Sequence, residues 1–316
     1  MPVHGIRLDL EFLALVAGAG IVSFFMTGEL VSNVLFTALI GVLFFLIGLH
    51  LDIDRVRKNL HQQEELGLGM LMIYVVTPFL AFVVSNIVTG GLSDAFIAIG
   101  VSAAAIGSPV VWSNLGKGSG DVALVVSGVS LFAGIAVIPL LLLSFGASIP
   151  VLEIAKKNFL FIGAPLVLGV AAKRFENFLF DDLRHHFSKV ALWLLVLVMA
   201  VQFQILYQSQ GLAFLQSIGT GIVLMALFVL VSFGIAYLAA LDFTGISERE
   251  ARALGFSSGS KAIGIALFIA AQLSAEAVAF VSVYFFVRQA VCGAIAEYFR
   301  HGELKTVKVM LDRMPV

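Results

Sequence analysis

The sequence predicts an all-α membrane protein with ten transmembrane helices, arranged as two five-helix repeats of opposite topology. Its composition, its apolar runs and the placement of its basic residues support this fold class. Hydrophobic residues make up 60% of the 316 residues and charged residues 12%, against about 45–50% and about 25% in soluble domains. A soluble core cannot bury so much apolar surface, so lipid must solvate the chain. This composition excludes disordered, nucleic-acid-binding and disulfide-rich secreted proteins.

Ten apolar runs define the predicted spans. A helix needs about 20 residues to cross ~30 Å of hydrocarbon, and the runs approach that length. They cover residues 10–26, 30–51, 66–87, 95–115, 122–145, 158–172, 190–207, 217–241, 253–272 and 277–298. The first run follows several charged residues and precedes no obvious small-x-small cleavage site, which favours a retained span over a signal peptide.

The basic residues support this count and orient it. When successive connections alternate between two sides, one side receives only Lys156 and Lys157. The other side receives 15 of the 19 basic residues, namely Arg7, Arg55, Arg57, Lys58, Lys117, Lys173, Arg174, Arg184, Lys189, Arg249, Arg252, Arg300, Lys305, Lys308 and Arg313. By the positive-inside rule this side is cytoplasmic. We therefore expect a multi-pass protein of the cell (inner or plasma) membrane with both termini in the cytoplasm.

Two interrupted spans occupy matching positions in the predicted repeats, residues 1–146 and 147–316. The fourth span contains Gly107-Ser108-Pro109, and the ninth contains Ser257-Ser258-Gly259-Ser260. Lipid cannot satisfy the backbone groups that a broken helix frees, so neighbours, water or a ligand must do so. Half-helix N-termini attract anions, and the carbonyl ends attract cations. A kink packed by neighbours would explain one break, whereas two matching breaks in an inverted repeat favour a binding site.

Lys261 and Arg288 are the ionisable residues that fall deep within predicted spans, and no Asp or Glu accompanies them. A charge at the bilayer centre costs about 2.5–3.5 kcal/mol even on insertion-based scales, and it usually has a function. We expect Lys261, which directly follows the second break, to contact the solute. A desolvated lysine loses its proton readily, so Lys261 could also carry a proton in a coupled cycle. Arg288, with its neighbour Gln289, could line the site or cap the carbonyl end of a half-helix.

Two stretches resemble the bile acid:sodium symporter family of the bile-arsenite-riboflavin transporter superfamily. The first reads Ser108-Pro109-Val110-Val111-Trp112-Ser113-Asn114, then Gly120-Asp121-Val122-Ala123-Leu124 and Pro139, and the second reads Ser247-Glu248-Arg249-Glu250 before Ala253-Leu254-Gly255-Phe256. The resemblance implies a core domain of spans 3–5 and 8–10, in which spans 4 and 9 cross at mid-membrane. It also implies a panel domain of spans 1, 2, 6 and 7, against which the core moves.

The resemblance also implies candidate site residues. It places sodium ligands at Ser113 and Asn114 and at hydroxyl residues of the fifth span. Ser127 and Ser130 are available there, although strict alignment puts Val125 and Val129 at the family's hydroxyl positions. The remaining candidates for substrate or ion binding flank the two breaks: Ser108, Pro109, Trp112, Ser257, Ser258, Gly259, Ser260 and Lys261. Thr77, beside Pro78 in the third span, could face the site or could equally staple a kink.

The ninth span departs from the family's Glu-x-Gly-x-Gln-Asn pattern. Ser257 replaces the Glu, Lys261 the Gln and Ala262 the Asn. Loss of a carboxylate and gain of an ammonium group disfavour sodium binding. We therefore expect a secondary active transporter of small organic anions or amphipathic solutes that works by alternating access. Its sodium coupling would be weak or replaced by Lys261.

Two alternatives remain open. One is a monovalent cation:proton antiporter of similar fold, suggested by Phe45-Leu46-Ile47-Gly48-Leu49-His50-Leu51-Asp52 but lacking the deep Asp residues of those proteins. The other is a sodium-coupled solute symporter. An enzyme is disfavoured, because no metal motif or pair of deep carboxylates is present. We expect no cofactor beyond a coupling ion, H⁺ or Na⁺, and as partners the lipid bilayer and a small anion but no nucleic acid; monomer and homodimer are both open.

Overall fold

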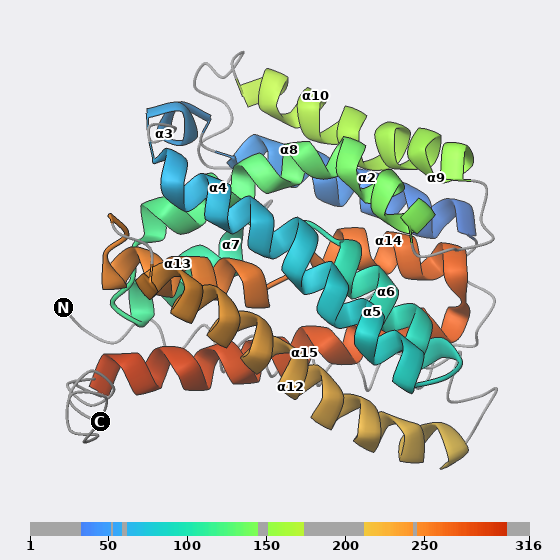
Figure 1. The fold of residues 1–316 in the computed structure, drawn as a ribbon. Helices are drawn as coiled ribbons and strands as arrows, with labels where there is room; N and C mark the ends of the chain where they lie inside the picture. Colours follow the sequence, from blue (N-terminus) through green and yellow to red (C-terminus); the bar gives the residue numbers. More distant parts are fainter. Residues whose placement is uncertain are drawn as a thin grey trace, which may run out of the picture.

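The first part of the chain forms helices with two irregularities, a π-helical turn after α4 and a non-helical gap after α6. The computed structural model describes residues 33–51, 53–58, 62–144, 151–173, 212–242 and 245–301. Within these ranges the first elements are α2 (Asn33–His50), α3 (Ile53–Lys58), α4 (Gln63–Leu71), the π-helical turn η1 (Met72–Val76), α5 (Thr77–Ile87), α6 (Gly91–Val101), α7 (Gly107–Leu115) and α8 (Gly120–Ser144). The turn η1 joins α4 to α5 in one continuous rod, whereas α6 and α7 are separated by a non-helical segment (Figure 1).

The second part of the chain repeats this mixture of continuous and broken helices. Its elements are α9 (Val151–Asn158), the π-helical turn η2 (Phe159–Gly163), α10 (Ala164–Lys173), α12 (Leu212–Asp242), α13 (Glu248–Gly259), α14 (Ile263–Leu273) and α15 (Ala275–His301). A capping box starts α13, where Ser247 and the side chain of Glu250 satisfy each other's backbone amides. The described residues are all-helical apart from turns, loops and one isolated bridge between two residues.

Within the residues that the structure describes, five helical stretches are long and apolar enough to cross a membrane. They are Gln63–Ile87, Gly120–Ser144, Ala155–Ala172, Ile218–Asp242 and Ala275–Arg300. They coincide with the predicted third, fifth, sixth, eighth and tenth spans, and α2 covers most of the second. The predicted fourth and ninth spans are split into α6 with α7 and α13 with α14. The predicted first and seventh spans, residues 10–26 and 190–207, lie outside the described residues, so the ten-span topology stays a prediction.

Close backbone contact fixes α2 against α10. A Cβ atom added at Gly48 would lie 2.3 Å from the carbonyl oxygen of Leu166, and one added at Gly169 would lie 2.1 Å from that of Phe45. Glycine therefore lets the two helices approach more closely than any side chain would allow. Such contacts are typical of helix pairs in membranes, where small residues replace the hydrophobic effect as the basis of packing.

In the part of the chain that the structure describes, α3 and the start of α13 both carry basic residues and lie at the same end of the helices (Figure 1). There the amide of Ser119 donates to the carbonyl of Arg249 over 2.9 Å, so the turn after α7 touches the start of α13. At the opposite end the carboxylate of Glu276 accepts a hydrogen bond of 3.1 Å from the amide of Gly91, where α6 begins beside α15. Lys157, on the side predicted to be poor in basic residues, donates to Gln272 at the end of α14.

Candidate functional site

The two breaks meet and pair with each other. The first break covers residues 102–106 and the second covers residues 260–262. The amide of Ala105 donates to the carbonyl of Ser260, and the amide of Ala262 donates to that of Ala103, each over 2.8 Å. These bonds flank an isolated antiparallel bridge between Ala104 and Lys261. The two breaks, residues 102–106 and 260–262, thus form one crossing. Their pairing satisfies backbone groups that lipid could not satisfy.

Both breaks are displaced from the residues that sequence reasoning placed in them. Gly107-Ser108-Pro109 form the first turn of α7 rather than the gap before it. Proline suits a first turn because its missing N–H would have no helical partner there. In the second break, Ser257-Ser258-Gly259 still belong to α13, and only Ser260, Lys261 and Ala262 are non-helical. The breaker residues thus mark helix ends beside the gaps.

Lys261 is the central polar side chain of the crossing. It is fully buried, and its Nζ donates to the carbonyl of Ser102 over 3.1 Å and to that of Ile73 over 2.9 Å. Ser102 directly follows α6, so its carbonyl belongs to the negative end of that helix dipole. Ile73 lies in η1. The ammonium group therefore joins the third predicted span to the carbonyl end of α6.

Arg288 and Tyr284 of α15 complete the opposite side of the crossing. Arg288, which is 2% exposed, donates to the carbonyl of Lys261 just beyond the end of α13. The Tyr284 hydroxyl donates to the carbonyl of Gly259 over 3.0 Å and accepts from the amide of Lys261 over 3.2 Å. Each broken helix thus has a basic side chain at its carbonyl end, Lys261 for α6 and Arg288 for α13.

Two further predicted site residues order the crossing through hydrogen bonds. Ser130 of α8 accepts a hydrogen bond of 3.2 Å from the amide of Ala104 and donates to the carbonyl of Ser127. The Trp112 indole N–H donates to the side-chain oxygen of Gln289 over 3.3 Å. Ser130 therefore holds the first break on α8, and Trp112 ties α7 to α15.

Several predicted serines have buried hydroxyl groups that make no hydrogen bond. Among the predicted site residues that the structure describes, the hydroxyls without a hydrogen-bond partner belong to Ser108, Ser113, Ser127, Ser257 and Ser258. Buried hydroxyls of this kind are uncommon, because an unmet hydrogen bond costs free energy. These five hydroxyls therefore keep an unused hydrogen-bonding capacity in the described structure.

Other predicted residues lie apart from the crossing. Asn114 is exposed and lies beside Gly120, about 10 Å along α7 from Gly107 at 1.5 Å per residue. Thr77 is 1% exposed, and its hydroxyl donates to the carbonyl of Met72 over 2.6 Å within the same rod of helices. Asn114 therefore marks the far end of α7, and Thr77 acts on the local geometry of η1.

The start of α7 faces open space beside the crossing. Gly107 is exposed, and a Cβ atom added there would meet nothing within 4 Å. No side chain caps this helix, and Pro109 in its first turn is buried. Free amides at a helix N-terminus carry partial positive charge and bind anions.

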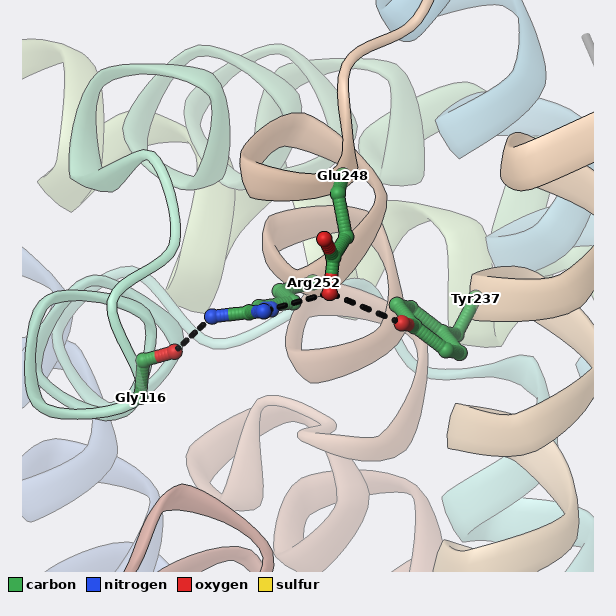
Figure 2. A network of polar contacts seen from close by, with 4 residues as sticks. All are labelled: Gly116, Tyr237, Glu248 and Arg252. Carbon is green, nitrogen blue, oxygen red and sulfur yellow. Dashed lines mark hydrogen bonds and ion pairs between the residues drawn. The ribbon is translucent and has the colours of Figure 1, made fainter. Parts of the chain in front are cut away.

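Sequence reasoning missed a polar cluster around Arg252, shown in Figure 2. Arg252 is 9% exposed, donates to the carbonyl of Gly116 over 3.1 Å and pairs with Glu248. The Tyr237 hydroxyl donates to the same carboxylate over 3.4 Å, and the guanidinium lies 4.7 Å from the ring centre of Phe299. Four helices therefore converge here: α7, α12, α13 and α15. The only sequence signal was an arginine directly before the predicted ninth span, which the charge count assigned to a loop.

Comparison with known protein families found a match over nearly two thirds of the chain. Residues 37–240 match the model of the Sodium Bile acid symporter family. The match contains the first break, whereas the second break with Lys261 lies beyond it. No curated protein matches the chain significantly. Because the family match covers more than half of the sequence and the described helices include five apolar spans, the chain is a membrane transport protein that belongs to the Sodium Bile acid symporter family.

Proposed function

We propose that the protein is a secondary active transporter of small organic anions or amphipathic solutes, in which Lys261 takes the place of a bound sodium ion. The main support for this proposal is the positive charge at the crossing. Lys261 and Arg288 both lie there, and neither has a carboxylate partner among the described residues. A buried cation without a counter-charge is costly, and an anionic solute would offset that cost.

The open start of α7 supports the same substrate class. Its uncapped amides, the exposed backbone of Gly107 and the unpartnered hydroxyl of Ser108 form a set of hydrogen-bond donors. A carboxylate or other oxyanion matches such donors well. The solute would thus bind between the α7 terminus and the Lys261 side of the crossing, with the unpartnered serines as further contacts.

The position of the Lys261 ammonium group supports the proposed replacement of sodium. Lys261 Nζ is held by two backbone carbonyl oxygens, the kind of ligand that a hard monovalent cation also prefers. A tethered ammonium in this position supplies the charge of the ion without being transported. Sodium dependence of uptake is therefore expected to be weak.

Alternating access would use the repeat architecture. We infer ten spans in a 5+5 inverted repeat, a core of spans 3–5 and 8–10, and a panel of spans 1, 2, 6 and 7. The tight contact of α2 with α10 through Gly48 and Gly169 suits a rigid panel. The basic connections at one end of the helices support cytoplasmic placement of that end and of both termini.

Counterflow in liposomes tests this proposal. Liposomes that contain the purified protein would be loaded with one unlabelled solute, and the entry of the same solute in labelled form would be measured. The probes are a bile acid, short-chain monocarboxylates and their uncharged amides. We expect exchange of at least one carboxylate, no exchange of its amide, and little change when sodium is replaced by choline. Exchange of the amides alone, or no exchange of any probe, would overturn the proposal.

A sodium-coupled symporter is the second candidate, because the family match favours it. It predicts that the same carboxylate exchanges only when sodium is present. Lys261→Gln separates the two cases, since a neutral side chain removes the tethered charge. If Lys261 replaces sodium, this variant gains sodium dependence, whereas a sodium-coupled symporter shows strong sodium dependence in the wild type already.

A further inference from the structure

Two groups can donate a hydrogen bond to the carbonyl of Ile73, the Thr77 amide and the Lys261 ammonium group. In an α-helix it would accept the amide N–H of Thr77, four residues later. In η1 the Thr77 amide instead donates to the carbonyl of Met72, five residues back. The Thr77 hydroxyl donates to that same Met72 oxygen over 2.6 Å. The π-helical register thus frees the Ile73 carbonyl, and Lys261 Nζ occupies it at 2.9 Å.

Pro78 makes the two registers similar in hydrogen bonding. Proline has no N–H, so the Tyr74 carbonyl lacks its helical donor in the α register too. The change from π to α geometry therefore exchanges one partner of Ile73 for another, Lys261 for the Thr77 amide. Single π-turns within α-helices are frequent at functional sites.

We propose that η1 is a switch that holds and releases the Lys261 side chain. In the π register the ammonium group is seated on Ile73 and Ser102. In the α register the Thr77 amide takes the Ile73 carbonyl, and Lys261 is freed to pair with the bound anion. Thr77 is the positioning residue, because its hydroxyl reinforces the π register. This inference rests on the proposed function for the role of the anion.

The proposal explains how anion binding and helix geometry are linked. A fully buried ammonium cannot leave two carbonyl partners without a replacement. Without an anion, the carbonyls of Ile73 and Ser102 are the acceptors that the described structure gives this ammonium group, so the π register dominates. With an anion near the α7 terminus, Lys261 gains a charged partner, and the population shifts toward the α register.

Nuclear magnetic resonance in bilayers can read the register without any substrate. Ile73-Tyr74 is the one Ile-Tyr pair in the sequence, so carbonyl-¹³C isoleucine with ¹⁵N-tyrosine selects the Ile73 carbonyl signal. Added ¹⁵N-threonine then reports the distance from that carbon to the Thr77 nitrogen. We expect this distance to be shorter in Lys261→Met than in the wild type and unchanged in the exposed-lysine control Lys156→Met. An unchanged distance in folded Lys261→Met would overturn the proposal.

Transport kinetics give a second reading if Lys261→Met does not fold. Thr77→Val removes the hydroxyl but keeps the shape of the buried side chain, whereas Thr77→Ser keeps the hydroxyl. For a carboxylate that the wild type exchanges, we expect Thr77→Val to lower KM several-fold and Thr77→Ser to leave it near the wild-type value. Equal KM values in Thr77→Val and the wild type would overturn the switch. A protein that changes register but exchanges no anion would instead overturn only the proposed function.

Discussion

The Nζ atom of Lys261 lies 3.1 Å from the carbonyl oxygen of Ser102, which is 159 residues earlier in the sequence. This contact puts a positive charge at the carbonyl end of α6, where the helix dipole is negative. Arg288 does the same for α13 through the carbonyl of Lys261. The two basic side chains are thus built into the ends of the broken helices, and the following predictions test that arrangement and its surroundings.

Loss of the Lys261 donor should destabilise the protein. Lys261→Ala leaves the carbonyls of Ile73 and Ser102 buried without a partner, which costs about 1–3 kcal/mol for each group. Lys261→Gln keeps an amide donor and should lose less. Thermal unfolding in detergent measures both variants, with the exposed Lys156→Ala as the control. Equal melting temperatures for Lys261→Ala and the control would contradict a stabilising role for the two hydrogen bonds of Lys261.

Arg252 should matter more for stability than a surface arginine of the same helix bundle. Arg252→Ala removes a nearly buried donor to Gly116 and a cation over Phe299, and we expect a loss of about 2 kcal/mol. Arg300→Ala is the matched control, because Arg300 is exposed and its contact with Glu297 is 3.7 Å long. Such a surface pair contributes at most about 1 kcal/mol. Chemical denaturation of both variants provides the comparison, and similar losses would argue against the cluster.

The glycine contact between α2 and α10 should tolerate no side chain. Gly48→Ala and Gly169→Ala each place a Cβ atom less than 2.5 Å from a backbone oxygen, and we expect a loss of about 1–3 kcal/mol from overpacking. Gly234→Ala in α12 meets nothing within 4 Å and should be neutral or stabilise by up to about 1 kcal/mol. Melting temperatures of the three variants decide the matter. A harmless Gly48→Ala would show that the helices lie further apart.

The Cys292 thiol should resist alkylation in the folded protein. It is fully buried in α15, 3.5 Å from the hydroxyl of Ser260. We expect maleimide to react with it only after denaturation, whereas a cysteine placed at exposed Lys117 should react at once. Mass spectrometry of native and denatured samples measures the difference. Rapid native labelling of Cys292 would mean that the second break is open to solvent.

The sequence predicted the existence of the two breaks but not their positions. Gly107-Ser108-Pro109 and Ser257-Ser258-Gly259-Ser260 indicated breaks in the correct two spans, but all of them except Ser260 lie in the helices beside the gaps. Their types do not reveal whether they end a helix or begin one, since proline fits a first turn and serine fits both ends. The gaps are filled largely by alanines, residues 103–105 and 262, which carry no local signal. Pairing between the two breaks decides where they lie.

The charged side chains of the candidate site were predictable from the sequence, but the backbone groups that they contact were not. Lys261 and Arg288 were identified because charges in apolar spans are rare. Their partners are backbone carbonyls far away in the sequence, which no spacing rule indicates. Thr77 and Pro78 suggested a kink in the third span, but nothing local indicated that the Ile73 carbonyl accepts a hydrogen bond from Lys261 of the ninth span. Arg252 was counted with the loop residues because its distance from the span edge is small.

The pairing of Ala103 and Ser102 with residues of the second break sets the order in which the molecule can be completed. The first break is synthesised about 160 residues before the side chain and amide that satisfy it. Until the ninth span emerges, the nascent first half holds unpaired backbone groups that hydrocarbon will not accept. During biogenesis the fourth span must therefore wait near water or the insertion machinery. A chain truncated after α8 should be caught there by quality control rather than released into the bilayer.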